Sequence, residues 1–83
     1  MRVRYFAWLR ARIGRAEEEI PLPPEVGDVA ALLDWLVGRG GSYEAALANR
    51  GAIRVAVNKE YVGFSHPLAE GDEVALFPPV TGG

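Results

Sequence analysis

The chain has 83 residues, a formal net charge of −2, 49% hydrophobic residues and 24% charged residues, values typical of one small globular domain. It contains no cysteine, which excludes disulfides, thiolate catalysis and cysteine metal sites, and makes a reducing cytoplasm the expected location. No apolar stretch approaches the roughly 20 residues of a membrane span, and arginines interrupt the first apolar run. We therefore expect neither a membrane partner nor a signal peptide.

Basic residues gather at the start of the chain, where residues 1–15 contain five arginines and no acidic residue. Such a cluster can bind nucleic acid. The chain as a whole is acidic, however, and no aromatic-basic recognition motif accompanies the cluster, so we expect no nucleic-acid partner. A docking face for an acidic protein and an ordinary solvated surface are the two remaining interpretations.

Residues 2–10 alternate in polarity with the period of a strand. The face expected to be buried carries Val3, Tyr5, Ala7 and Leu9. The face expected to be outward carries Arg2, Arg4, Phe6, Trp8 and Arg10. Gly14 allows a turn, and residues 15–22 are predicted to return as the hairpin partner.

One helix is predicted after the prolines at 21, 23 and 24, with Asp28 as its N-cap. Its apolar stripe has helical spacing and consists of Val29, Leu32, Leu33, Leu36 and Val37. Glycines at 38, 40 and 41 are expected to end this helix, because glycine tolerates the left-handed geometry of a C-terminal cap. A short second helix is predicted from Tyr43 to Leu47.

The second half of the chain predicts three strands separated by turns. Ile53, Val55 and Val57 alternate, a short strand is expected around residues 61–63, and residues 73–77 form the last strand. Val74 and Leu76 are expected to point inward in that strand. The whole order predicts an α+β fold of the β-grasp type, a mixed sheet of four to five strands covered on one face by one main helix.

The last six residues are expected to leave the domain, which gives a β-grasp domain over 1–77 and a tail over 78–83. Two prolines at 78 and 79 cannot extend a central strand, and six extended residues reach about 20 Å. Gly82 and Gly83 lack Cβ atoms, so they can enter a narrow channel and leave the terminal carboxylate open to attack. A frayed terminus without function is the alternative.

A catalytic or metal site is not expected in the domain itself. His66 is the only histidine and has no nearby cluster of carboxylates, so it is interpreted as a turn residue rather than a metal ligand. Ser65 lacks the partners of a hydrolase triad. The domain is therefore predicted to carry a reagent, and the carrying group is the carboxylate of Gly83.

Three segments together resemble a known family. They are residues 6–10 (Phe-Ala-Trp-Leu-Arg), 57–62 (Val-Asn-Lys-Glu-Tyr-Val) and, most specifically, 66–83, which end in Phe-Pro-Pro-Val-Thr-Gly-Gly. The chain resembles the small subunit of molybdopterin synthase, a sulfur carrier of the ubiquitin-like class. The helical region is generic, and Trp8 and Arg12 lie outside the family motif.

The resemblance implies a reaction at the end of the chain. An adenylating enzyme related to ubiquitin activators would consume ATP to charge Gly83, and a sulfurtransferase would supply sulfur for a thiocarboxylate. The tail, with Pro79, Val80, Thr81 and Gly82, would then insert into the large synthase subunit. There the sulfur would pass to cyclic pyranopterin monophosphate, within a heterotetramer of two large and two small subunits. No bound cofactor is implied, because sulfur is carried covalently.

A partner surface is predicted by strand parity as well as by the resemblance. Phe6, Tyr61 and Phe77 are expected to face outward near the tail and form an apolar patch. The alternative is that Phe6 or Phe77 folds over an edge of the core. Arg10 lies at a family motif position and is interpreted as a partner for carboxylates of the activating enzyme, or as a plain surface arginine.

Other functions stay open at this point. The chain can be a sulfur carrier for thiazole or for thiolated tRNA, a ubiquitin-like modifier joined to lysines through Gly83, or a binding module with an inert tail. The Phe-Pro-Pro-Val-Thr-Gly-Gly ending favours the molybdopterin carrier.

Overall fold

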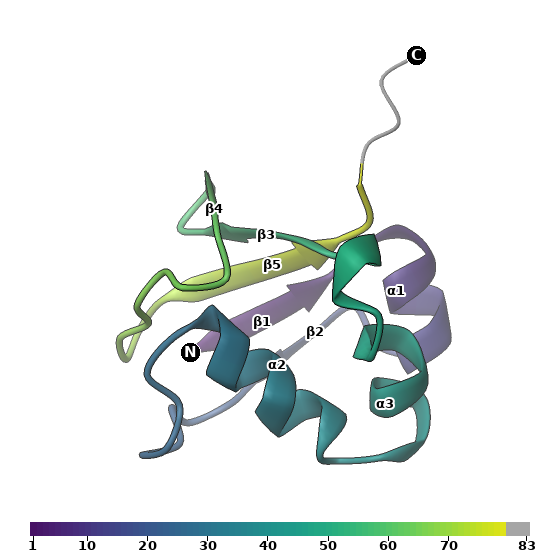
Figure 1. Cartoon of the computed structure of the whole chain (residues 1–83), viewed down its shortest axis with the longest axis horizontal. Helices are drawn as coiled ribbons and strands as arrows, with labels where there is room; N and C mark the ends of the chain where they lie inside the picture. Colours follow the sequence, from purple (N-terminus) through teal and green to yellow (C-terminus); the bar gives the residue numbers. More distant parts are fainter. Residues whose placement is uncertain (80–83) are drawn as a thin grey trace.

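The computed structural model describes residues 1–79, which form a five-stranded mixed sheet with helices packed against one face (Figure 1). The strands are β1 (Arg2–Tyr5), β2 (Glu17–Glu19), β3 (Arg54–Val57), β4 (Glu60–Val62) and β5 (Glu73–Phe77). The helices are α1 (Ala7–Ile13), α2 (Val29–Val37), α3 (Gly41–Leu47) and the 3-10 turn η1 (Arg50–Ala52). The strand order is β2-β1-β5-β3-β4, with β1 and β5 parallel and the other pairs antiparallel.

This arrangement confirms the predicted β-grasp fold. The hairpin partner expected within residues 15–22 is β2, and the last strand begins and ends where it was expected. None of the helices within residues 1–79 has the length and apolar character to cross a bilayer. The division into a domain over 1–77 and a tail over 78–83 stays a prediction, because most of the tail lies outside the described residues.

The strand predicted over residues 2–10 is wrong beyond Tyr5. The chain turns at Ala7, which has a φ of 55°, and continues as α1. The neighbouring strand β5 ends at Phe77 and prolines follow it, so residues 7–10 have no strand beside them to satisfy their backbone groups. Leu9 is buried as expected, but it shares its buried helical face with Ile13, four residues later, whereas Ala7 is exposed.

The expectation of one main helix is also too simple, because three helices cover the sheet. α2 lies across the inner face, and α1 stands at the end of the sheet where β1 and β5 finish (Figure 1). α3 packs against both α1 and α2. The predicted second helix is therefore confirmed, and it begins two residues before Tyr43.

The predicted cap and apolar stripe of α2 are both present. The Asp28 carboxylate accepts a hydrogen bond of 2.8 Å from the backbone N–H of Ala31, which satisfies one free amide of the first turn. The stripe is fully buried at Val29, Leu32, Leu33 and Leu36, and Val37 is partly buried. Gly40 follows with a φ of 74°, a conformation that favours glycine, and lets the chain reverse into α3.

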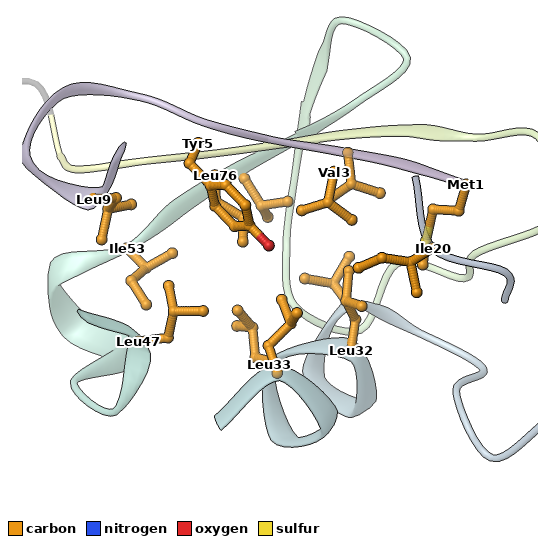
Figure 2. Packing of buried hydrophobic residues seen from close by; sticks show 14 of the residues in the cluster. Met1, Val3, Tyr5, Leu9, Ile20, Leu32, Leu33, Leu47, Ile53 and Leu76 are labelled. Carbon is orange, nitrogen blue, oxygen red and sulfur yellow. The ribbon is translucent and has the colours of Figure 1, made fainter. Parts of the chain in front are cut away.

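The apolar core fills the layer between the helices and the sheet (Figure 2). Leu33 of α2 and Leu47 of α3 point towards Tyr5 and Leu76, which come from the two central strands. All four side chains are at most 1% exposed. Every buried side-chain nitrogen and oxygen described within residues 1–79 has a hydrogen-bond partner. The inner face of the sheet is therefore fully packed against the helices, and its other face is left for solvent or a partner.

Glu18 is the one member of the acidic run that points inward, because it lies opposite Val3 in the β1–β2 register. Its carboxylate accepts hydrogen bonds of 2.7 Å from the hydroxyls of Tyr5 and Tyr43 and one of 2.8 Å from Arg39. Burial acts to raise the pKa of Glu18, but the hydrogen bonds from Arg39, Tyr43 and Tyr5 outweigh it and hold the pKa below its usual value. This cluster fastens the edge strand β2 to the helical layer.

Replacing Leu33 by alanine is expected to lower the free energy of unfolding by about 2–5 kcal/mol, because the substitution leaves a cavity in a fully buried site. Urea denaturation of the full chain measures this loss. Leu22→Ala is the matched control, since it removes the same atoms from a partly buried position and is expected to cost less. Equal losses for the two variants would contradict the packing described above.

Glu18→Gln is expected to flatten the acid dependence of stability. A carboxylate whose folded pKa is lowered stabilises the fold above its unfolded pKa, and that stability is lost as the pH falls through the folded pKa. The wild-type chain should therefore lose more unfolding free energy than the variant as the pH drops below 4.5, the ordinary glutamate value. Urea titrations at several pH values test this. Glu25→Gln, at an exposed position, should keep the wild-type slope.

Candidate functional site

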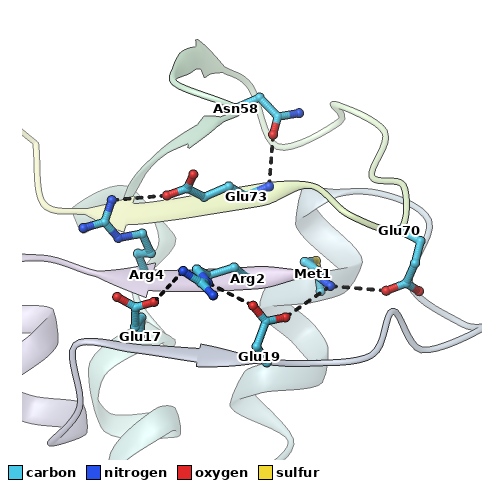
Figure 3. Close-up of polar contacts among 8 residues, drawn as sticks. All are labelled: Met1, Arg2, Arg4, Glu17, Glu19, Asn58, Glu70 and Glu73. Carbon is cyan, nitrogen blue, oxygen red and sulfur yellow. Dashed lines mark hydrogen bonds and ion pairs between the residues drawn. The ribbon is translucent and has the colours of Figure 1, made fainter.

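The outer face of the sheet has a charged half over β2, β1 and the start of β5 (Figure 3). Arg2 lies between Glu17 and Glu19, with nitrogen–oxygen distances of 3.2 and 2.9 Å. Arg4 contacts Glu73 at 3.2 Å. The Arg2 pairs are exposed and the Arg4–Glu73 pair is partly buried, so these contacts at the surface contribute modestly to stability. With two arginines against three glutamates, this half of the sheet is a solvated surface of mixed charge.

The other half of the outer face is apolar. We call Phe6, Tyr61, Ala75 and Phe77 the apolar patch, since these side chains together line one shallow surface. Tyr61 is 82% exposed and Phe6 is 38% exposed. The ring centroids of Tyr61 and Phe77 are 5.6 Å apart. The predicted outward placement of the three aromatic residues is confirmed, although Phe77 is partly buried.

A hollow of about 520 Å³ continues the apolar patch past the edge of the sheet. It shares Tyr61 and Phe77 with the patch and is completed by Arg54, Val55 and Val62. Arg54 lies opposite Phe77 in the β3–β5 register. The hollow is therefore an apolar depression with a cationic side chain at its margin, and it opens beside the residue after which the chain leaves the sheet.

We call the end of β5, Leu76 and Phe77, the tail root. It is hydrogen-bonded to Phe6, the residue before α1. The backbone N–H of Phe6 donates a hydrogen bond of 3.0 Å to the carbonyl of Leu76, one residue before β5 ends. Pro78 and Pro79 follow β5 and are partly buried. The predicted tail residues Val80, Thr81, Gly82 and Gly83 lie outside the described residues. The apolar patch thus includes Phe77, the last residue of β5 before the tail, and Phe6, which is bonded to Leu76.

Arg10 is not part of the apolar patch. The strand pattern predicted it on the outer face of the sheet, but it lies on the exposed side of α1. A different arginine, Arg4, stands over the Phe6 ring with its guanidinium carbon 5.1 Å from the ring centroid. Sequence reasoning missed Ala75 and Arg54, although the parity that turned Val74 and Leu76 inward also turns Ala75 outward.

The region around His66 is a turn, as predicted. Its backbone N–H donates to the carbonyl of Gly63, and its carbonyl accepts from the N–H of Val29 at the start of α2. Across the part of the chain that the structure describes, no three histidine, aspartate or glutamate side chains gather as metal ligands. The candidate site within residues 1–79 is the apolar patch, a surface of the kind that often marks protein interfaces.

Residues 3–83 match the ThiS family. The chain belongs to this family. Its relatives include the molybdopterin synthase sulfur carrier subunit of Escherichia coli, which is 39% identical over 83 residues that span 100% of this chain and 99% of the relative. The corresponding subunit of Haemophilus influenzae is 34% identical over the same shares of the two chains.

Solved structures of similar shape place this ThiS-family chain among β-grasp proteins. The crystal structure of SAMP1 from Haloferax volcanii superimposes with a TM-score of 0.73 at 33% identity, covering 100% of this chain and 98% of that chain. A chain from the complex of subunits 1 and 2 of molybdopterin-converting factor from Helicobacter pylori superimposes with a TM-score of 0.64. That chain is 24% identical, with 99% of this chain and 96% of the other covered, so it supports the fold alone.

Tyr61→Ala is expected to change the free energy of unfolding by no more than about 0.5 kcal/mol, because the side chain is 82% exposed. Tyr5→Ala removes the same atoms from a site that is 1% exposed, and is expected to cost about 3 kcal/mol or more. Thermal and urea denaturation of both variants measure the difference. A large loss for Tyr61→Ala would mean that the aromatic side chains of the apolar patch serve the fold rather than a partner.

Proposed function

We propose that this chain is the sulfur-carrier subunit of molybdopterin synthase. The observation that carries the proposal is the joint position of the apolar patch and the tail root on a ThiS-family fold, in a chain whose sequence ends in Gly82-Gly83. The full-length identity of 39% with the Escherichia coli sulfur carrier supports it. The product served is molybdopterin, formed by sulfur transfer to cyclic pyranopterin monophosphate.

The reactive group in this proposal is the carboxylate of Gly83. Attack of the carboxylate on the α-phosphorus of ATP gives an acyl adenylate and releases pyrophosphate. Hydrosulfide then attacks the carbonyl carbon and AMP leaves, so the chain ends in a thiocarboxylate. A persulfide donor instead gives an acyl disulfide, and a second thiol of the donor cleaves its S–S bond, which releases the thiocarboxylate and leaves the donor as a disulfide. Two glycines suit both steps, because the carbonyl carbon is approached without hindrance from a neighbouring Cβ.

The folded domain contributes position rather than catalysis. Phe77 and the prolines after it direct the chain away from the sheet at the apolar patch, so a protein seated on the patch receives the tail. Pro79, Val80, Thr81 and Gly82 would then lie along the channel of that protein. Phe6, Tyr61 and Phe77 supply aromatic contacts of the kind enriched at protein interfaces.

Three partners follow from this chemistry. The large synthase subunit holds the active site and completes a heterotetramer, and the relative from Escherichia coli, which is named a subunit of molybdopterin synthase, supports a partner of this kind. A ubiquitin-activator-like adenylating enzyme charges Gly83 with ATP, and Arg10, exposed on α1, is a contact for its carboxylates. A sulfurtransferase supplies the sulfur, so the carrier needs no bound cofactor of its own. A cysteine-free chain suits a reducing cytoplasm.

Deletion of Gly83 is expected to abolish molybdopterin formation without lowering the melting temperature, because the deletion removes the reactive carbonyl and none of the residues of the described core. The assay combines the carrier, its activating enzyme, a sulfur donor, the large subunit and the precursor, and measures molybdopterin. Lys59→Arg is the control variant, since it removes the only lysine and is expected to keep full activity.

Intact-mass measurement of the chain purified from cells separates the proposal from its rivals. A carrier gains the mass of one sulfur in place of one oxygen at Gly83. A protein modifier is found as adducts on lysines of other proteins, and an inert tail shows neither change. Molybdopterin formation by the chain without Gly83 would contradict the proposed sulfur-carrier function.

A further inference from the structure

The solvent side of α1 carries an exposed tryptophan and an exposed arginine one helical turn apart. Trp8 is 43% exposed, and Arg12 follows four residues later, so both lie on the same flank of the helix. Leu9 and Ile13 occupy the adjoining, buried side and hold α1 against the core. The position of the Trp8–Arg12 flank is therefore fixed, and its exposure is not a consequence of a loosely attached helix.

Charge on this flank is not balanced within the domain. Arg2, Arg4 and Arg15 each contact a glutamate, at distances between 2.9 and 3.3 Å. Arg12 makes no ion pair or side-chain hydrogen bond with any residue in the range 1–79, and no acidic residue occurs before Glu17. An exposed guanidinium suits a bidentate carboxylate, and an exposed indole beside it suits the apolar part of the same partner.

The flank begins two residues after Phe6, a member of the apolar patch. Phe6 belongs to the patch and directly precedes α1, and its backbone N–H is bonded to Leu76 beside the tail root. Trp8 lies two residues beyond Phe6, and α1 stands at the end of β5 (Figure 1). A protein that covers the patch is therefore close to the start of α1, where Trp8 lies.

We propose that Trp8 and Arg12 form a second docking surface for an acidic segment of the large subunit, on which an aspartate or glutamate pairs with Arg12 and an apolar side chain covers Trp8. The proposal rests on the function proposed above, which supplies the large subunit as the partner. Protein is favoured over nucleic acid as the occupant because the chain has a net charge of −2 and the exposed Glu17 and Glu19 follow α1. Trp8 and Arg12 thus set how tightly the carrier binds, apart from the tail chemistry.

Calorimetric titration of the full chain with the large subunit tests the proposal. Arg12→Glu is expected to weaken binding about tenfold or more, since it places a carboxylate against the acidic segment, and to reduce the dependence of affinity on salt. Trp8→Ala is expected to weaken binding about fivefold or more. Melting temperatures of both variants should match the wild type, because both side chains are exposed.

Lys59→Glu is the matched control for charge. It reverses one exposed cation at the β3–β4 turn, at the opposite end of β3 from Arg54, and is expected to leave the affinity unchanged. Tyr61→Asp is the control for the apolar patch and is expected to weaken binding of the large subunit strongly. These controls separate the local contact at α1 from the effect of net charge.

Three other outcomes would contradict the proposal that Trp8 and Arg12 form a docking surface for the large subunit. If Tyr61→Asp weakens binding while Arg12→Glu and Trp8→Ala bind like the wild type, α1 is not a docking surface and the proposed function stands. If Arg12→Glu affects only the adenylating enzyme, or only binding to an RNA oligonucleotide, the occupant named here is wrong. If the wild-type chain does not bind the large subunit at all, the proposed function fails together with this inference.

Discussion

The parallel pairing of β1 with β5 is the contact on which the rest of the structure depends. It joins residues 2–5 to residues 73–76, from the two ends of the described chain, in the centre of the sheet. Parallel strands cannot be connected by a tight turn, so the chain between them must cross the sheet, and the helical layer is built from that crossing. Both strands finish at the same end of the sheet, where Phe6 and Phe77 both line the apolar patch. One pairing therefore determines both the position of the core and the point at which the chain leaves the sheet.

Side chains alternate along these strands between the inner face of the sheet, which forms the core, and the outer face, which is available to other proteins. Inward residues complete the apolar core, and outward residues near β2 neutralise each other through exposed ion pairs. The apolar patch lies where those charges end, so an approaching protein can bury apolar surface at the end of the sheet from which the tail departs. Relatives of this ThiS-family chain include sulfur carriers, and this relationship is the basis for proposing that the apolar patch docks the partner that receives the tail.

Most of the fold could be predicted from the sequence, because the apolar periods of α2, β3 and β5 and the cap at Asp28 are local signals. The structure of residues 7–13 could not be predicted in this way. Leu9 has the spacing of a strand residue relative to Tyr5, and it has the spacing of a helix residue relative to Ile13. Only the length of β5 decides between the two, and that length is a property of the sheet. Glu18 illustrates the same limit, because three consecutive glutamates look alike until the register turns one of them inward. The outward aromatic residues were predictable from parity, whereas the roles given to Gly83 and the tail residues stay predictions.

The hairpin between β3 and β4 turns through Asn58 and Lys59, whose φ values of 52° and 71° are unusual for residues other than glycine. Lys59 is the sole lysine of the chain, and the Met1 amino group is held 3.2 Å from a Glu70 carboxylate oxygen. An amine-reactive fluorophore would therefore attach mainly at this hairpin tip. The tip lies at the opposite end of β3 from Phe77 but two residues before Tyr61, so the fluorescence of the dye would report directly on a protein that covers this side of the sheet.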